Sequence, residues 1–370
     1  MPGSISDPDA TKEEGTLMAA ATPQTAPAGD ESPLDVGWTG VIASEVAQAP
    51  DLTCTACGEG TIVDGYCDQC GTPPPDPRNH FTQAPASWVG GVCDIGKRHA
   101  RNEDAMALSA TEPAGSRAAL IVCDGVSMAT DSHIASLAAC KAAQAVLDQL
   151  LPRGVGTPAA VAAAAGQALT RAVLEANEAV TQTVVGDVPN PPSCTFAAAI
   201  VDAGVITAGN VGDSRVYWLP DAADEEPRHL GRDDSYADEQ IRAGMSRSEA
   251  ENGPDAHAIT RWLGRDAPDD ITPHLATVTV TSPGWLMVAS DGLWNYESEA
   301  AALRELLQAS IVQVGDEPVA IAQALVDFAN AQGGRDNITV ALARLTGQGS
   351  STSNGAAPTG APEEGDPLHG

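Results

Sequence analysis

The chain has 370 residues, enough for one large catalytic domain with accessory segments. Its 50 acidic and 19 basic side chains give a formal charge of -31, which argues against nucleic-acid binding because Lys and Arg must neutralise phosphates. No apolar run of about 18 residues occurs, so no membrane span is expected. The polar, acidic N-terminus lacks the regions of a signal peptide, and we therefore expect a cytoplasmic protein.

Composition divides the chain into five segments. Residues 1–50 are rich in Ala, Pro, Thr and Ser without periodicity, which predicts a disordered segment. A cysteine-rich module follows at 51–72, and a Pro-rich stretch at 73–85 predicts a stiff, extended linker. A large domain is expected at 86–346, followed by a flexible tail at 347–370.

Two Cys-x-x-Cys pairs lie nine residues apart in the cysteine-rich module, and a glycine follows each pair. Four thiolates in this arrangement suit one tetrahedral, structural Zn²⁺, and a module this short needs a metal to fold. The alternatives are a redox pair or a coincidental cysteine-rich loop. With so few basic residues, a module that docks an unidentified protein partner is expected. The predicted zinc ligands are Cys54, Cys57, Cys67 and Cys70.

The large domain alternates strand-like and helix-like segments. Runs rich in Val, Ile, Thr and aromatic residues predict strands at 88–93, 118–123, 194–201, 204–208, 214–219, 276–281, 285–289 and 337–344. Cap residues predict helices from Ser132 to about Leu151, from Thr157 to about Thr183, from near Glu299, and from behind Asp316 to near Gly333.

The run 199–205 predicts a hairpin around Asp202, with the strand at 214–219 continuing an antiparallel meander. Strands in meanders, with helices inserted in pairs, favour an α+β layered domain over a doubly wound α/β sheet.

Acidic residues stand at the ends of predicted strands, beside Gly, Ser or Asn. One such residue is usually a turn former, but several in one domain favour a shared acidic cavity. Carboxylate oxygens select Mg²⁺ or Mn²⁺, and a pair of such ions lowers the pKa of a bridging water for attack on phosphorus. The residues are Glu103, Asp104, Asp124, Asp213, Asp291 and Asp336.

These acidic residues belong to motifs that occur in a familiar order. The motifs are Asn102-Glu103-Asp104, Val122-Cys123-Asp124-Gly125, Ser193-Cys194-Thr195-Phe196, Gly209-Asn210-Val211-Gly212-Asp213-Ser214-Arg215, Asp233-Asp234-Ser235, Ile259-Thr260-Arg261-Trp262-Leu263-Gly264, Ala289-Ser290-Asp291-Gly292-Leu293 and Gly334-Arg335-Asp336-Asn337-Ile338-Thr339-Val340. In this order they resemble the metal-dependent Ser/Thr protein phosphatases of the 2C type, especially the bacterial members. The resemblance covers about residues 88–345 and implies a four-layer α/β/β/α sandwich with two antiparallel sheets.

The resemblance also implies roles for the acidic residues. Asp124 would bridge two Mg²⁺ or Mn²⁺ ions, and hydroxide held between them would displace the Ser or Thr oxygen without a phosphoenzyme. Asp213 would lie beside a weaker third position, which stays open. The implied metal-site residues are Glu103 and Asp104, which act mainly through metal-bound waters, Asp124, the Gly125 carbonyl, Asp213, Asp291 and Asp336.

Two positions depart from the family's pattern. Its phosphate-gripping Arg stands four residues before Glu103, where this chain has His99, with Arg98 one residue earlier. Since His lacks the bidentate fork of Arg, either Arg98 reaches in or His99 helps the metals to hold the phosphate. Animal members also carry a His after Asp-Gly, and here that residue is Val126. Residues 236–258 match the family's mobile flap and are expected to shape substrate choice.

Two functions therefore compete. The first is a Ser/Thr phosphatase, monomeric in its catalytic domain, that acts on phosphorylated proteins and opposes a bacterial Ser/Thr kinase. The second is a pseudophosphatase, an interaction protein tethered by its zinc ribbon, which the changes at His99 and Val126 keep open. A nucleic-acid-binding zinc ribbon is disfavoured by the charge of -31.

Overall fold

The computed structural model describes residues 53–54, 56–150, 156–253 and 255–347. The disordered segment predicted at 1–50 lies outside these ranges, and so does the predicted tail from residue 348 onward. None of the helices described combines the length and the apolar character needed to cross a bilayer.

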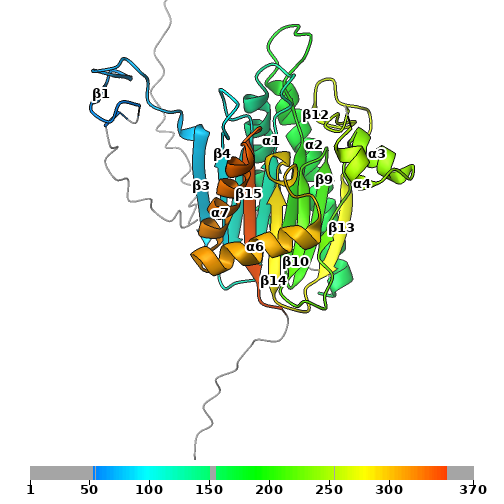
Figure 1. Cartoon of the computed structure of the whole chain (residues 1–370). Coiled ribbons are helices and arrows are strands. Elements are labelled where there is room, and N and C mark those ends of the chain that lie inside the picture. The colour runs from blue at the N-terminus through cyan, green and yellow to red at the C-terminus, as the bar shows by residue number, and fades with distance from the viewer. Residues whose placement is uncertain (1–52, 55, 151–155, 254, 348–370) are drawn as a thin grey trace, which may run out of the picture. The chain divides into compact units, whose positions relative to one another are not determined.

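Two antiparallel sheets form the centre of the large domain (Figure 1). In spatial order, the six-stranded sheet contains β11 (Arg228–His229), β10 (Arg215–Pro220), β14 (Gly284–Ala289), β15 (Ile338–Leu345), β4 (Val89–Asp94) and β3 (His80–Ala86). The five-stranded sheet contains β13 (His274–Thr279), β9 (Val205–Val211), β8 (Phe196–Asp202), β6 (Arg117–Cys123) and β5 (Ala105–Thr111).

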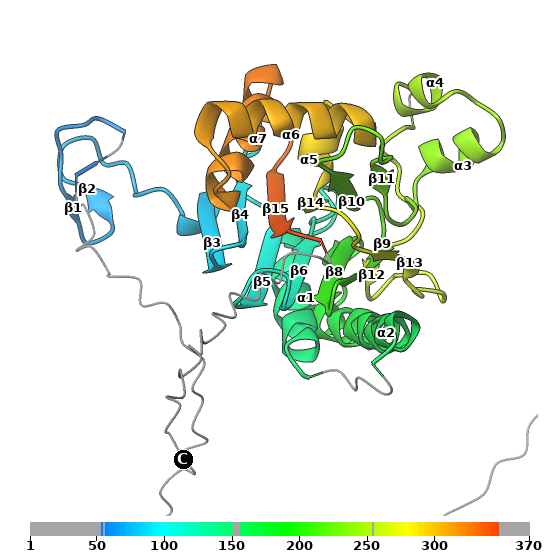
Figure 2. The same cartoon turned by 90° about the horizontal axis from the view of Figure 1, so that it is seen from below.

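Helices cover the outer face of each sheet. Figure 2 shows α6 (Ala300–Val314) and α7 (Pro318–Gln332) on the six-stranded sheet, and α1 (Ser132–Leu147) and α2 (Pro158–Gln182) on the five-stranded one. The predicted four-layer α/β/β/α sandwich is therefore confirmed.

Shorter elements complete the description. They are β1 (Ile62–Val63), β2 (Tyr66–Cys67), a 3-10 turn at Pro77–Asn79, β7 (Ser193–Cys194), α3 (Tyr236–Arg242), α4 (Arg247–Glu251), β12 (Leu263–Gly264) and α5 (Asp291–Trp294).

The layering explains why several strands are apolar throughout. Along β6, Leu120 and Val122 pack between the two sheets, while Ile121 and Cys123 pack against α1 and α2. Successive side chains of a strand point to opposite faces, and here both faces are covered. Leu120 is fully buried, so its truncation to Ala is expected to cost about 2–5 kcal/mol.

The predicted meander is wrong beyond its hairpin. The hairpin forms as expected, with Ala203 (φ 50°) and Gly204 (φ 74°) joining β8 to β9. However, β10 does not pair with β9, because the short turn after Val211 carries the chain into the other sheet. The spacing of strands along the sequence does not show whether a third strand pairs with the second or crosses into the sheet packed against it.

The linker predicted at 73–85 is also too long. Residues from His80 onward form the edge strand β3, which pairs with β4. Pro85 falls where the register shifts between Gln83 and Ala86. An edge strand tolerates Pro at such a place, because no ladder hydrogen bond is lost there.

The first long helix begins and ends differently from the prediction. Ser132 is its first helical residue and not its N-cap, which is Asp131 in the left-handed region (φ 52°). The helix ends at Leu147, before the predicted Leu151. The second helix has the predicted cap, since the Thr157 side chain accepts a hydrogen bond from the Ala160 N–H.

Candidate functional site

The predicted metal-binding aspartates meet at one end of the sandwich because of the strand order. Asp104 precedes β5 and Asp124 follows β6, and these strands are antiparallel neighbours. Asp291 follows β14 and Asp336 precedes β15, which form the corresponding pair in the other sheet. Asp213 lies in the crossing from β9 to β10. Since the end of one antiparallel strand lies beside the start of the next, all five reach the same edge.

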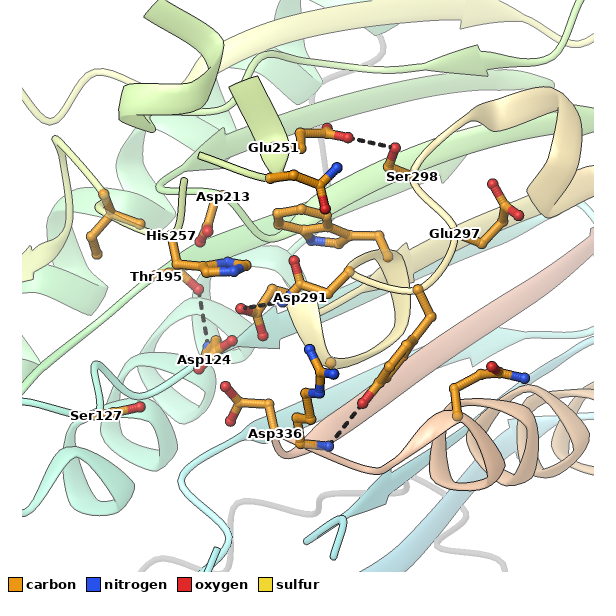
Figure 3. A pocket seen from close by; sticks show the side chains of 18 of the residues that line it. Asp124, Ser127, Thr195, Asp213, Glu251, His257, Asp291, Glu297, Ser298 and Asp336 are labelled. Carbon is orange, nitrogen blue, oxygen red and sulfur yellow. Dashed lines mark hydrogen bonds between the residues drawn. The ribbon is translucent and has the colours of Figure 1, made fainter. Parts of the chain in front are cut away.

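A cleft of about 1070 Å³ opens at this edge. Figure 3 shows the side chains of Asp124, Asp213, Asp291 and Asp336 gathered around a common space within it. Gly125 also lines the cleft. Five of the seven predicted metal-site residues therefore share one cavity, and the other two lie close beside it.

Asp104 lies behind the cleft wall and is fully buried. Its Oδ2 accepts hydrogen bonds from the hydroxyls of Ser290 (2.8 Å) and Thr339 (2.7 Å). Its Oδ1 is buried without a hydrogen-bond partner among the described residues. Desolvation raises the pKa of Asp104 to about 6, although the two hydroxyls work against that rise.

Asp124 is fixed through its backbone by Thr195. The Asp124 N–H donates to Thr195 Oγ1 at 3.0 Å, and the Thr195 N–H donates to the Asp124 carbonyl at 2.8 Å. Desolvation raises the pKa of Asp124 well above its usual range, and the charges of Asp104 and Asp291 raise it further. A bound cation would lower the pKa of Asp124 again, because a nearby positive charge favours the ionised carboxylate.

Asp291 opens α5, a short helix absent from the predicted elements. Its Oδ2 accepts a hydrogen bond from Asn295 at 3.0 Å, while its Oδ1 is buried with no partner in the described part of the chain. A Cβ on Gly292 would lie 1.9 Å from the Asn337 carbonyl oxygen, so only glycine permits this close approach. Desolvation raises the pKa of Asp291 well above its ordinary value, and the negative charge of Asp336 raises it further.

Asp213 lies beside a second, buried charge network. Desolvation raises its pKa to about 7, and Asp233 adds to the rise while Arg215 opposes it. Arg215 holds Asp233 through both carboxylate oxygens, with N···O distances of 2.6–3.1 Å. It also contacts Glu251 of α4 at 3.1 Å and stacks over Trp294, 3.6 Å from the ring centroid. Arg215 thereby ties the predicted flap to the cleft.

Asn337 was included in a motif, but its role was not predicted from the sequence. Its Oδ1 accepts a hydrogen bond from the Glu103 N–H at 2.7 Å, and its Nδ2 donates to the carbonyls of Ile95 (2.8 Å) and Arg101 (3.3 Å). Asn337 therefore joins the start of β15 to the loop that carries Glu103 and Asp104. A single Asn after an Asp does not reveal such long-range partners.

The two residues predicted to bind phosphate, Arg98 and His99, have different surroundings. His99 Nε2 is 3.2 Å from Asp336 Oδ1, so His99 contacts the predicted metal set. Arg98 is exposed and does not line the cleft. Glu103 approaches Gly125 so closely that a Cβ there would lie 2.7 Å from the Glu103 carbonyl oxygen.

The donor set fits divalent metal ions. Buried carboxylate oxygens without partners, at Asp104 and Asp291, are otherwise costly, and clustered like charges explain the raised pKa values. These are hard oxygen ligands, typical of Mg²⁺ and Mn²⁺ sites. Among the described residues, no three of these carboxylates have oxygen atoms that all lie within 4.8 Å of one another, so some ligands would reach the ions through waters, as Mg²⁺ sites allow.

The four cysteines of the N-terminal module form a separate centre. In the described part of the chain, they are the one group of three or more His, Cys, Asp or Glu whose ligand atoms all lie within 4.8 Å of one another. Cys54 Sγ lies 3.6 Å from Cys70 Sγ, and Cys57 Sγ lies 3.7 Å from Cys67 Sγ.

The backbone around these thiols has the form of two metal knuckles. Gly58 (φ 72°) and Gly71 (φ 71°) turn the chain after each pair. The Gly60 N–H points at Cys57 Sγ, at 3.4 Å. Hydrogen bonding with Thr72 lowers the pKa of the Cys70 thiol to about 6. The Cys70 N–H also lowers the pKa of Cys67, but desolvation and the hydrogen bonds with the Cys70 and Cys54 thiols outweigh that effect and raise the pKa of Cys67 to about 11. The placement of the four sulfurs and the two glycine turns, and not the pKa values, therefore supports a metal site.

Comparisons with known proteins agree with this geometry. The family model described as Protein phosphatase 2C matches residues 95–329. Protein phosphatase PhpP of Streptococcus pneumoniae is 36% identical over 148 residues, which are 40% of this chain and 55% of the relative. The chain thus spans about half the length of the curated relatives it matches.

Two solved structures share the fold. The Mycobacterium tuberculosis serine/threonine phosphatase PstP/Ppp is 25% identical, with a TM-score of 0.55, and the match covers 70% of this chain and 98% of that one. The PPM Ser-Thr phosphatase MsPP of Mycobacterium smegmatis is 28% identical, with a TM-score of 0.52, over 70% of this chain and 100% of that one. Together with the family match over residues 95–329, these likenesses show that the chain belongs to the protein phosphatase 2C family.

Proposed function

We propose that the chain is a metal-dependent protein Ser/Thr phosphatase that hydrolyses phosphoserine and phosphothreonine. The observation that carries this proposal is the convergence of Asp104, Asp124, Asp213, Asp291 and Asp336 on one edge, with buried carboxylate oxygens that lack partners. When bound, two Mg²⁺ or Mn²⁺ ions supply a water of lowered pKa aligned for attack on phosphorus.

The residues divide the work of holding these ions. Asp124 lines the cleft, and desolvation and the charges of the other carboxylates raise its pKa, so it is proposed to be shared by both ions, assisted by the Gly125 carbonyl. Asp291 and Asp336, which lie at the end of the six-stranded sheet, would hold one of the ions. Asp104 and Glu103 are proposed to act through waters, since neither lines the cleft.

Asp213 and His99 have proposed roles beside this pair of ions. Asp213 lines the cleft and is proposed to hold a third metal ion. The reaction as proposed needs only the other two. His99 contacts Asp336 at 3.2 Å and is proposed to orient that carboxylate.

The alternative is a pseudophosphatase that acts only as an interaction protein. The occupied set of carboxylate positions favours the enzyme, because a binding module does not need clustered, desolvated charges. The similarity to Protein phosphatase PhpP supports the same choice.

Hydrolysis assays test the enzyme directly. The purified chain with manganese is expected to hydrolyse an aryl phosphate and a phosphothreonine peptide, and Asp124→Asn is expected to abolish both. Asp316→Asn, an exposed change of the same kind, serves as the matched control. If wild type shows no more activity than Asp124→Asn with either magnesium or manganese, the phosphatase proposal fails.

The N-terminal module is proposed to hold one Zn²⁺ through Cys54, Cys57, Cys67 and Cys70 and to dock a protein partner. Four protein ligands leave no open position, so the site is structural. Phosphorylated proteins in the cytoplasm and an opposing Ser/Thr kinase are the proposed biological partners, and the catalytic domain is proposed to be monomeric.

A further inference from the structure

The cleft is strongly acidic except at one place. Seven acidic side chains and two arginines, Arg247 and Arg335, line it. Arg247 is already neutralised, with N···O distances of 2.7 Å to Glu251 and 2.9 Å to Glu299. The Arg335 guanidinium has no ion pair or hydrogen bond within the described ranges, so it is the one unpaired arginine of the lining there.

The backbone holds Arg335 firmly although its side chain is free. The Arg335 N–H donates to the Tyr296 hydroxyl at 2.9 Å. Gly333 (φ 142°) and Gly334 (φ 51°) precede it, and a Cβ on Gly334 would lie 2.4 Å from Asn330 Oδ1. The turn that presents Arg335 is therefore closely packed.

Arg335 is also adjacent in the chain to a predicted metal ligand. Consecutive Cα atoms are about 3.8 Å apart, and Arg335 and Asp336 line the same cleft. An arginine side chain beginning there is long enough to reach a phosphate that lies against metals held by Asp336. Arg98, by contrast, is exposed and does not line the cleft.

We infer that Arg335 is the side chain that binds the substrate phosphate. Its guanidinium offers paired N–H donors that match two phosphate oxygens, and its charge offsets the acidic lining. The inference rests on the proposed phosphatase function and adds to it a role for Arg335, which stands in the last sequence motif without an assigned role.

Steady-state kinetics with two substrates test the inference. For Arg335→Ala, KM for para-nitrophenyl phosphate and for a phosphothreonine peptide is expected to rise on the order of tenfold, because a charge-assisted contact is lost. The value of kcat is expected to stay within about twofold, since the contact serves ground and transition states alike. Arg335→Lys keeps the charge without the fork, so its KM is expected to rise only about threefold.

Binding of inorganic phosphate provides a readout without turnover. Calorimetric titration of the manganese-loaded protein is expected to give a phosphate Kd about tenfold weaker for Arg335→Ala than for wild type. Arg242→Ala, an exposed arginine of α3 that does not line the cleft, is the control of equal charge. It is expected to leave both KM and the phosphate Kd unchanged.

The outcomes separate this inference from the proposed function. An inactive wild type overturns the phosphatase function, while the phosphate Kd still decides for or against Arg335. An unchanged KM and Kd in Arg335→Ala overturn the inference alone. The inference is also overturned if Arg98→Ala, and not Arg335→Ala, weakens phosphate binding. It is overturned as well if Arg335→Ala raises KM for the peptide but not for para-nitrophenyl phosphate.

Discussion

The Asn337 side-chain oxygen accepts a 2.7 Å hydrogen bond from the Glu103 N–H, across 234 positions of the chain. The same side chain donates to the carbonyls of Ile95 and Arg101. One buried amide thus holds the loop before β5 against the start of β15. Asp104 lies in the loop before β5, and Asp336 directly precedes Asn337. Asn337 therefore sets the distance between two carboxylates that come from different sheets.

Asn337→Ala is expected to lower both stability and metal affinity. Losing these buried hydrogen bonds should reduce the free energy of unfolding by about 2–3 kcal/mol. The loop that carries Asp104 would also shift, so more manganese should be needed for half-maximal activity. Urea unfolding and a manganese titration of activity measure the two effects.

The matched control is Asn252→Ala, whose exposed side chain makes one hydrogen bond within the described ranges, to the Ser248 carbonyl. It is expected to change stability by less than about 0.5 kcal/mol. If Asn337→Ala lowers stability but leaves the manganese requirement unchanged, Asn337 supports the fold without positioning the carboxylates.

The metal-free protein is expected to lose stability as the pH rises. Desolvation raises the pKa of Asp104 to about 6 and of Asp213 to about 7, from an ordinary value of 3.8. Between the unfolded and folded pKa values the folded chain binds more protons, so its free energy of unfolding falls with increasing pH. For these two groups the loss begins near pH 4 and is complete above pH 7, while Asp124 and Asp291, whose pKa values are raised further, add to the loss in the same direction. Manganese is expected to reverse it.

Urea unfolding with a chelator at pH 5 and pH 8 measures this dependence. Asp213→Asn removes one titrating group, so its stability loss between the two pH values should be smaller than that of wild type, by on the order of 2 kcal/mol. Equal losses in wild type and variant would show that Asp213 is not desolvated as described.

The approach of four predicted metal-site aspartates, Asp124, Asp213, Asp291 and Asp336, was predictable because each stands beside an apolar strand that the sequence predicts. Strand order then brings them together, and the motif resemblance supplies that order. β5 was missed because its run, Ala105–Thr111, is rich in Ala and Ser and poor in β-branched residues. Pairing with β6 decides its structure, and local propensity does not report such pairing.

Other features were not predictable from local pattern. The crossing of β10 into the second sheet depends on packing between sheets, which strand spacing does not encode. The exposure of Arg98 and the presence of Arg335 in the cleft depend on loop paths. For Asn337, the three partners that define its role come from distant segments.

The buried Arg215 pair is expected to matter far more for stability than an exposed pair of the same type. Arg215 and Asp233 expose 3% and 6% of their side chains, whereas Arg344 and Asp221 expose 30% and 41%. Arg215→Ala leaves a buried carboxylate unpaired and should cost about 3–5 kcal/mol. Arg344→Ala, the matched control, should cost less than about 1 kcal/mol.

Urea unfolding of the two variants makes the comparison. Arg215→Met restores part of the packing over Trp294 and is expected to unfold at a higher urea concentration than Arg215→Ala. Similar losses for Arg215→Ala and Arg344→Ala would mean that the flap is not anchored by Arg215.

Removing the thiols of the N-terminal module is expected to remove its metal without harming catalysis. Among its described residues the module buries only Cys54, Gly60 and Cys67, too few for an apolar core, so a bound metal is expected to stabilise its fold. The double variant Cys54→Ser/Cys57→Ser should bind no zinc, against one zinc per wild-type chain by elemental analysis. Aryl phosphatase activity should be unchanged, because these thiols do not line the carboxylate cleft.

Tyr66→Ala is the control for this experiment, since Tyr66 is 60% exposed and lies in β2 of the same module. It should retain one zinc per chain, which separates loss of a ligand from general damage to the module. Wild type without zinc after purification in zinc-containing medium would contradict the zinc assignment. If the double variant loses aryl phosphatase activity together with zinc, the module stabilises the carboxylate cleft. That result would contradict the expectation that the module only docks a protein partner.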